Sequence, residues 1–182
     1  MNRKAACFVF AVLAAGVSFA QQVNREVEVV QKVDLDRYAG NWYEIARFPN
    51  NFQKQCTANV AAEYKLRGDG QIDVINRCRK SDGAHDRASG VGRVVDLESN
   101  AKLKVRFAPA WLSWLPFVWG DYWIVGLPSD YSYAVVGGPS REYLWILSRT
   151  PALPDAAYKE ALQQAADQGY DTSKLLKTVQ EK

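Results

Sequence analysis

Two cysteines, Cys56 and Cys78, are the first residues of this 182-residue sequence whose type and spacing could support chemistry. A third cysteine, Cys7, lies in an apolar N-terminal run. A pair of thiols can form a metal site, a redox site or a structural disulfide. Two isolated cysteines make a poor zinc site, because structural zinc is held by four ligands. A disulfide closing a loop of about 20 residues contributes about 3 kcal/mol in the chain-entropy model, so we favour a disulfide.

Residue types typical of catalytic and metal sites are sparse. His85, the one histidine of the sequence, lies in a polar turn, so we interpret it as a solvated loop residue rather than a metal or haem ligand. Residues 88–92 are the nearest approach to the Gly-x-Ser-x-Gly nucleophile motif and do not match it. Neither a Gly-x-Gly-x-x-Gly motif nor a phosphate loop occurs. We therefore predict no catalytic residue, no metal site and no cofactor.

Glu44 is the carboxylate with the most specific position. It follows Trp42 by two residues in the strand-like run 40–47, so strand alternation places both side chains on the same inner face. A buried carboxylate needs a partner. Glu44 can pair with an arginine or tyrosine of the surrounding wall, or it can hydrogen-bond the headgroup of a ligand. The sequence leaves both interpretations open.

The first 20 residues have the features of a secretory signal peptide. Basic residues precede the apolar run 7–17, and small residues lead to a cleavage point after Ala20. Cys7 lies too early for a lipoprotein signal, so we predict no lipid anchor. Residues 21–33 are interpreted as an N-terminal extension, followed by one helical turn at 34–38. The protein is expected to be exported, to the periplasm, to the outer membrane as an associated protein, or to the medium.

Composition and charge limit which folds and which partners are possible. The sequence is 48% hydrophobic and 12% aromatic, which fits one globular domain with a substantial core. Without the two basic residues of the signal peptide, 21 of the 23 basic residues remain against 20 acidic ones, a net charge of about +1. This balance gives no sign of a nucleic-acid partner.

Strand-like runs separated by hairpin-length gaps fill most of the sequence. The clearest is 102–107, where three cations alternate with Leu103, Val105 and Phe107, so that one face is wet and the other is buried. An Asp-Gly step at 69–70 is a strong hairpin signal. The predicted strands are 41–47, 57–66, 71–79, 89–96, 102–107, 121–127, 131–136 and 142–149.

Eight strands joined in sequence by tight turns indicate an all-β protein. They fit an eight-stranded antiparallel up-and-down β-barrel of the size that holds one small ligand, and a sandwich of the same strands is the alternative. One C-terminal α-helix is expected after Pro154, with Ala157, Leu162 and Ala165 on its packed side. The extended piece 175–179 could pair at the edge of the first strand.

Three segments carry a more specific pattern: Gly-x-Trp-Tyr-Glu-Ile-Ala at 40–46, Ser-Asp-Tyr-x-Tyr-Ala-Val at 129–135, and Tyr-Leu-Trp-Ile-Leu-Ser-Arg-Thr-Pro at 143–151. They resemble the three signature regions of the lipocalin family. The similarity is closer to the outer-membrane-type bacterial lipocalins related to apolipoprotein D, here without a lipobox. The resemblance covers about 34–180, so we assign 34–182 to a lipocalin domain.

This resemblance implies a calyx closed at one end. Trp42 would pack beneath the barrel with Arg149 across its ring, a structural cation–π contact of about 0.5 to 2 kcal/mol. Enzymes of the family, such as the prostaglandin synthase type, use a thiol inside the calyx, and a Cys56–Cys78 disulfide leaves none. Several relatives are membrane-anchored lipoproteins, but this signal peptide lacks a cysteine at its end, so attachment is not carried over.

The calyx is expected to hold an apolar ligand. An acyl chain that buries about 15 methylenes gains about 12 kcal/mol before the costs of ordering and association. Strand parity places a set of mainly apolar residues on the pocket wall. The expected ligand-binding residues are Glu44, Leu103, Val105, Phe107, Trp123, Tyr143, Trp145 and Leu147.

The segment 111–119 breaks the strand pattern, with one polar residue in nine. Strand order places it at the open end of the barrel. It could fold inward as a lid, contact a membrane surface to collect lipid, or pack against a second copy in a homodimer. Its large apolar residues are Trp111, Trp114, Phe117 and Trp119.

The function predicted from these features is binding. We expect a carrier or store of a fatty acid or lysophospholipid in cell-envelope lipid maintenance, and not an enzyme. The alternatives are a lipocalin-fold enzyme that acts on a lipid, and a tetrapyrrole carrier that works without a histidine in its wall.

Overall fold

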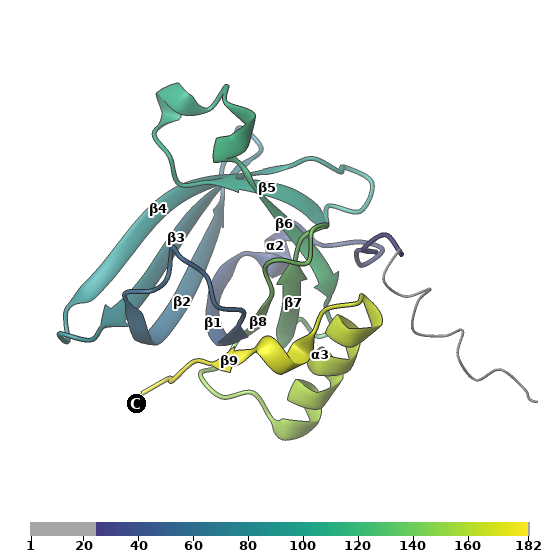
Figure 1. Ribbon diagram of the computed structural model, residues 1–182. Coiled ribbons are helices and arrows are strands. Elements are labelled where there is room, and N and C mark those ends of the chain that lie inside the picture. Colours follow the sequence, from purple (N-terminus) through teal and green to yellow (C-terminus); the bar gives the residue numbers. More distant parts are fainter. Residues whose placement is uncertain (1–24, 182) are drawn as a thin grey trace, which may run out of the picture.

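The computed structural model describes residues 25–181, so the predicted signal peptide and its cleavage point lie outside the described residues. Within them, one sheet runs in the order β2-β3-β4-β5-β6-β7-β8-β1-β9, and β1 also pairs with β2. The first eight strands therefore form a closed antiparallel barrel (Figure 1), as predicted. The strands are β1 (Gly40–Arg47), β2 (Cys56–Leu66), β3 (Gln71–Lys80), β4 (His85–Val94), β5 (Lys102–Arg106), β6 (Gly120–Gly126), β7 (Tyr133–Gly137), β8 (Trp145–Ser148) and β9 (Leu176–Lys177).

The main difference from the predicted strands is β4, which starts at His85 and not at 89. Gly83 adopts a positive φ of 81°, and the Lys80 amide donates to the Ala84 carbonyl at 2.9 Å, so the hairpin turns tightly. Pairing then begins at once, between Arg79 and His85. Residues at this end of β4 face solvent, so they lack the alternation that marks a half-buried strand.

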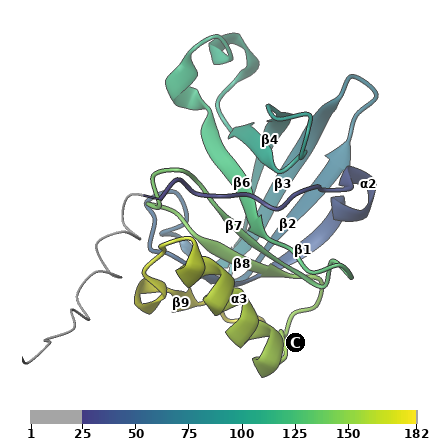
Figure 2. The same ribbon diagram turned by 90° about the vertical axis from the view of Figure 1, so that its right-hand side faces the viewer.

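Two α-helices frame the barrel in the described residues, α2 (Leu35–Tyr38) before β1 and α3 (Asp155–Asp167) after β8. Helix α3 packs on the outer face of β6 and β7 (Figure 2). Ala161 and Ala165 are its buried residues. None of the helices in the described part of the chain has the length and apolar character needed to span a membrane.

Of the three residues predicted to lie on the packed side of α3, Ala165 is the one that is fully buried. Ala157 and Leu162 are partly buried against the same cluster, while Ala161 is fully buried. Three short 3₁₀ helices complete the described elements. They are η1 (Ala110–Leu112), η2 (Pro116–Val118) and η3 (Thr172–Lys174).

The closed end of the barrel is built around Trp42. Its ring is fully buried, and its Nε1 donates to the Tyr38 carbonyl at 2.8 Å. The Arg149 guanidinium lies 3.8 Å from the ring centroid and donates to the Ala39 and Asn41 carbonyls, each at 3.0 Å. The contact implied by the family resemblance is therefore present.

A β-bulge in β1 reverses its alternation. Glu44 pairs with Leu147 and Ala46 pairs with Ile146, so Ile45 is an extra residue. Up to Glu44 the even-numbered side chains point into the barrel, whereas Ala46 lies in the outer cluster beneath α3. Arg47 consequently points to the same side as Glu44.

The C-terminal segment completes the barrel wall at the open end. Strands β1 and β2 pair directly only at the closed-end half of β1, up to Tyr43. Beyond that point β9 pairs with Ala46 and Arg47. On its other side, the Asn59 amide donates to the Val179 carbonyl at 2.8 Å. The predicted pairing with the first strand is confirmed, and the segment also bridges to β2.

Residues 25–33, part of the predicted N-terminal extension, pack along the barrel. Val27 is buried in the outer cluster under α3, and Val33 is buried in the inner cluster. The Val30 amide donates to the Ile124 carbonyl at 3.0 Å, which ties the segment to β6. These residues are thus part of the folded body.

Candidate functional site

A cavity of about 680 Å³ lies inside the barrel. Its volume is within the range of about 300 to 1,000 Å³ typical of small-molecule sites. The cavity mouth is the end of the barrel where the 48–55, 81–84 and 107–119 connections meet. Most of the lining area is contributed by apolar atoms, so the cavity suits an apolar ligand.

Six of the eight predicted ligand-binding residues line this cavity. They come from β1, from β5 and the residue after it, and from β8 and the residues before it. Tyr143 and Trp145 stack with ring centroids 5.9 Å apart and form one side of the mouth. The six are Glu44, Val105, Phe107, Tyr143, Trp145 and Leu147.

Two of the predicted residues lie elsewhere. Leu103 belongs to the packed inner core and borders only a small void at the closed end. Trp123 faces outward, where it joins the cluster under α3 and lies 4.5 Å from the Lys102 amino group. Residues directly opposite in a ladder share a face, and Trp123 pairs with the outward-facing Lys102. The inward residue of this part of β6 is Tyr122.

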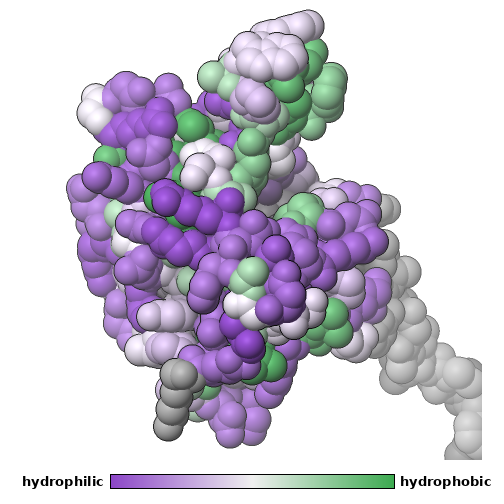
Figure 3. Space-filling model, turned by 90° about the vertical axis from the view of Figure 1, so that its left-hand side faces the viewer, coloured by the Kyte–Doolittle hydropathy of each residue, from purple (hydrophilic) through white to green (hydrophobic). Residues whose placement is uncertain are grey.

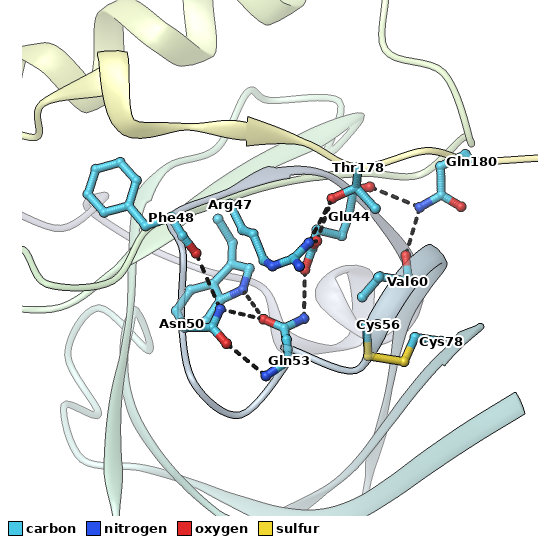
Figure 4. Close-up of polar contacts among 11 residues, drawn as sticks. Glu44, Arg47, Phe48, Asn50, Gln53, Cys56, Val60, Cys78, Thr178 and Gln180 are labelled. Carbon is cyan, nitrogen blue, oxygen red and sulfur yellow. Dashed lines mark hydrogen bonds and ion pairs between the residues drawn. A yellow bond between two sulfur atoms is a disulfide. The ribbon is translucent and has the colours of Figure 1, made fainter. Parts of the chain in front are cut away.

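The Glu44 carboxylate is the centre of a polar network in the wall (Figure 4). It is 2% exposed, and Arg47 Nη1 lies 2.7 Å from its Oε1. Gln53 Nε2 donates to Oε2 at 2.8 Å, and the Thr178 hydroxyl donates to Oε1. Both carboxylate oxygens are thus satisfied by protein groups, which supports pairing with the wall over contact with a ligand headgroup.

Gln53 connects this network to the mouth. Its Oε1 accepts from Trp145 Nε1 at 3.1 Å and from Asn50 Nδ2 at 2.8 Å. The neighbouring Phe52 packs against Tyr143 and Trp145, with ring centroids 5.6 Å and 6.1 Å away. Gln53 and Phe52 could not be predicted from strand alternation, because residues of an irregular loop follow no period. The unusual length of the loop was the one available signal.

Cys56 and Cys78 form the expected disulfide. It links the ends of β2 and β3 at the mouth and contributes to the cavity lining. With both sulfurs bonded, these cysteines offer no thiol to the cavity. His85, predicted to be a loop residue, is exposed at the first position of β4.

Three tyrosines form a hydrogen-bonded chain at the floor of the cavity, which we call the tyrosine triad. The Tyr38 and Tyr122 hydroxyls are 2.7 Å apart, and the Tyr122 hydroxyl donates to that of Tyr64 at 2.9 Å. Burial raises the pKa of Tyr38 and Tyr122 well above the usual tyrosine value. Burial also raises the pKa of Tyr64 to about 12. The phenols therefore stay protonated near neutral pH.

The triad was not predicted from the sequence, although strand alternation indicates one of its members, Tyr64. Ala58, Val60, Ala62 and Tyr64 alternate along β2 and are all buried, so the period identifies Tyr64 as inward. Tyr122 was hidden because its strand is apolar on both faces.

The 111–119 segment stands away from the barrel at the rim (Figure 1). Trp111, Trp114 and Phe117 are 74%, 77% and 79% exposed and do not line the cavity. Viewed from the mouth side, the segment projects as a pale and green knob above a mainly hydrophilic surface (Figure 3). In this arrangement the three side chains do not cover the cavity.

Trp119 differs from the other three aromatic residues of the segment. Its ring lies 4.2 Å from the Arg93 guanidinium and 5.2 Å from that of Arg106, and its Nε1 donates to the Ser113 carbonyl at 2.8 Å. These contacts anchor the segment to β4 and β5 at the rim, where Trp119 also contributes to the cavity lining, and they leave the other aromatic side chains in solvent.

The arrangement is suited to binding a hydrophobic molecule. Within the described residues, no group of three or more His, Cys, Asp or Glu side chains could hold a metal ion. The Glu44 network and the tyrosine triad are each linked by internal hydrogen bonds, and most of the lining area is apolar. Such a cavity can desolvate and orient a hydrophobic molecule.

Comparisons with known proteins agree with this geometry. A family model described as a Lipocalin-like domain matches residues 33–180. Temperature-induced lipocalin-1 of Arabidopsis thaliana is 44% identical over 158 residues, which cover 86% of this chain and 84% of that protein. The outer membrane lipoprotein Blc of Escherichia coli K12 is 40% identical over 153 residues, covering 84% and 82%.

Two more distant proteins are also similar to this chain. Apolipoprotein D of Mus musculus is 31% identical over 161 residues, covering 84% of this chain and 79% of that protein. The solved structure of insecticyanin from the tobacco hornworm Manduca sexta has a TM-score of 0.66 at 22% identity and covers 85% of this chain and 84% of that one. The likeness to insecticyanin concerns the fold alone.

Proposed function

This chain belongs to the lipocalin family, whose members bind small hydrophobic ligands, and we propose that its barrel carries or stores a fatty acid or lysophospholipid in cell-envelope lipid maintenance. The observation that carries the proposal is the cavity of about 680 Å³, lined mainly by apolar atoms, inside a closed barrel. At about 25 cal/mol for each Å² of apolar surface removed from water, one acyl chain provides ample driving force.

We propose a carrier and not an enzyme. The two cysteines at the mouth are bonded, and the one histidine is exposed on β4, away from the cavity lining. The raised pKa values of Tyr38 and Tyr64 also make these phenols poor proton donors and acceptors near neutral pH.

We also propose that the exposed aromatic residues of the 111–119 segment contact a membrane surface. Tryptophan is favoured at the interface between lipid and water, and the segment lies beside the mouth, where a lipid would enter. The relative from Escherichia coli is named an outer membrane lipoprotein, which fits an exported protein that acts near the envelope. Export to the periplasm, association with the outer membrane and secretion all agree with this role.

The test of the proposed function is ligand identification followed by titration. Protein purified without detergent is extracted, and bound small molecules are identified by mass spectrometry. Delipidated protein is then titrated with a fatty acid or a lysophospholipid while tryptophan fluorescence is followed, since Trp145 lines the cavity. Saturable quenching at micromolar concentration is the expected result.

A blocked variant makes this test specific. Ala88 points into the cavity, so Ala88→Phe fills part of it and is expected to weaken binding at least about tenfold. Ser89→Phe adds the same ring to the exposed outer face of the same strand and serves as the matched control. Absence of binding by any acyl ligand, together with turnover of an ester, would overturn the proposal.

A further inference from the structure

The tyrosine triad has one more hydrogen-bond donor than it uses. Each phenol carries a single proton. Because Tyr122 donates its proton to Tyr64, the bond between Tyr38 and Tyr122 must use the proton of Tyr38. The proton of Tyr64 is then left over. Within residues 25–181, the Tyr64 hydroxyl makes no hydrogen bond other than the one it accepts from Tyr122.

The unused donor faces the ligand cavity. Tyr64 is almost fully buried and lines both the main cavity and the small void at the closed end. Buried polar groups are hydrogen-bonded in the great majority of cases, and an unmet donor in such a place costs stability. A ligand atom is the partner that this position can receive.

A second polar group lies beside it on the same wall. Asn76 pairs with Ala62, and Tyr64 pairs with Val74, so Asn76 and Tyr64 are diagonal neighbours on the inner face of β2 and β3. The Asn76 carboxamide makes no hydrogen bond to the described residues, and it lines the cavity. Its neighbours across the strands are the small residues Ala62 and Ala88, which leave space around it.

The charges around this position favour a neutral partner over an anion. The Glu44 carboxylate is near enough to Tyr64 to add to the effect of burial on the pKa of that phenol. Arg47 is engaged by Glu44, and Arg149 lies beneath Trp42, held by backbone carbonyls. A carboxylate at the floor would therefore lose its hydration and meet a negative charge.

We propose that the floor of the cavity is a polar subsite that selects ligands whose inner end carries a neutral oxygen. The proposal rests on the proposed function, and it narrows the ligand class to acyl chains with a hydroxyl or carbonyl group at the end remote from the headgroup. The ligand oxygen accepts the proton of Tyr64, and the Asn76 carboxamide lies close enough to provide a second hydrogen bond.

The test compares two probes that differ only at the inner end, stearic acid and ω-hydroxystearic acid. Each is titrated into delipidated full-length protein, into Tyr64→Phe and into the control Tyr43→Phe, which removes a hydroxyl from the outer face of β1, away from the cavity. The ratio of the two dissociation constants is measured for each protein. Circular dichroism and thermal unfolding establish that the variants are folded.

The expected result is a ratio that favours ω-hydroxystearic acid by about fivefold in the wild type and in Tyr43→Phe, and that is lost in Tyr64→Phe. Stearic acid itself should bind all three proteins similarly. An unchanged ratio in Tyr64→Phe overturns the subsite and leaves the carrier function intact. An equal loss for both acids also overturns it, because the carboxyl group would then occupy the floor. Failure of both acids to bind the wild type overturns the carrier function together with the subsite.

Discussion

Arg47 forms an ion pair with Glu44 although the two residues are three positions apart on one strand. In a regular strand, such residues face opposite sides of the sheet. The extra residue at Ile45 brings Arg47 to the inner side, where its guanidinium reaches the buried carboxylate. The bulge thus provides the only cation that contacts Glu44 in the described residues.

Removal of this cation is expected to destabilise the barrel. Arg47→Met leaves a buried carboxylate without a charged partner and should lower the free energy of unfolding by about 3 kcal/mol in urea titrations. The double variant Glu44→Gln with Arg47→Met should recover at least about 1 kcal/mol of that loss. A single variant within about 0.5 kcal/mol of the wild type would contradict this prediction.

Arg149 is expected to be irreplaceable by lysine. A lysine ammonium cannot stack on Trp42 and also donate to the Ala39 and Asn41 carbonyls. We expect Arg149→Lys to cost about 2 kcal/mol, measured by chemical denaturation. The exposed pair of Arg67 with Asp73 gives the control, because Arg67→Lys should change stability by less than about 0.5 kcal/mol. Equal losses in the two variants would show that the contact at Trp42 adds nothing.

The disulfide should contribute about 3 kcal/mol to stability. Cys56→Ser with Cys78→Ser is expected to lower the free energy of unfolding by that amount relative to oxidised protein, as measured by urea titration. A reductant should bring the wild type to the level of the double variant and leave the variant itself unchanged. If a reductant also destabilised the double variant, the loss of stability in the reduced wild type would have a cause other than this disulfide.

The free energy of unfolding should fall at alkaline pH, because Tyr64 of the tyrosine triad loses its proton more readily in the unfolded state. The pKa of Tyr64 is raised to about 12 in the folded state. The unfolded value is about 10, so the unfolded state releases this proton first. The contribution is therefore fully present below about pH 10 and is lost as pH rises toward the folded value, by about 2 to 3 kcal/mol.

This dependence can be measured by urea unfolding at about pH 9 and about pH 12. Tyr64→Phe should show a smaller fall than the wild type between the two conditions. Tyr143→Phe, changed at the mouth and outside the triad, should follow the wild type. Parallel curves for Tyr64→Phe and the wild type would contradict the assignment.

The exposed aromatic residues beside the mouth are expected to govern vesicle binding. Replacement of Trp111, Trp114 and Phe117 by serine should weaken binding to phospholipid vesicles by at least about tenfold in sedimentation assays. Val95→Ser with Leu97→Ser removes exposed apolar residues at the closed end and should have no effect. Unchanged vesicle binding in the triple variant, with a shift from dimer to monomer, would favour contact with a second copy.

Alternation predicted the fold where one face of a strand meets water. Leu103 and Val105 point inward as expected, because the cations that alternate with them mark the outer face. On β7 every residue is buried, because α3 covers its outer side. Helix α3 also covers the outer side of β6, so the outward positions of that strand carry apolar residues. The sequence therefore has no polar position there that would mark Trp123 as facing outward.

The polar network could not be derived from sequence for a different reason. Glu44 was identified by parity, but its partners Gln53 and Thr178 lie in an irregular loop and beside a two-residue strand. Their positions follow from how the barrel closes in three dimensions. The bulge at Ile45 likewise depends on packing against α3 and on the register with β8.

The insertion of β9 between β1 and β2 bears on when the protein can take up its cargo. Thr178 and Glu44 are hydrogen-bonded although they are 134 residues apart in the sequence. The barrel wall therefore has a gap until the residues that follow α3 have been added to the sheet. Contacts of such separation form late in folding. If the protein is exported as proposed, the chain would therefore cross the membrane without a ligand, and loading would be confined to the compartment where the barrel is completed.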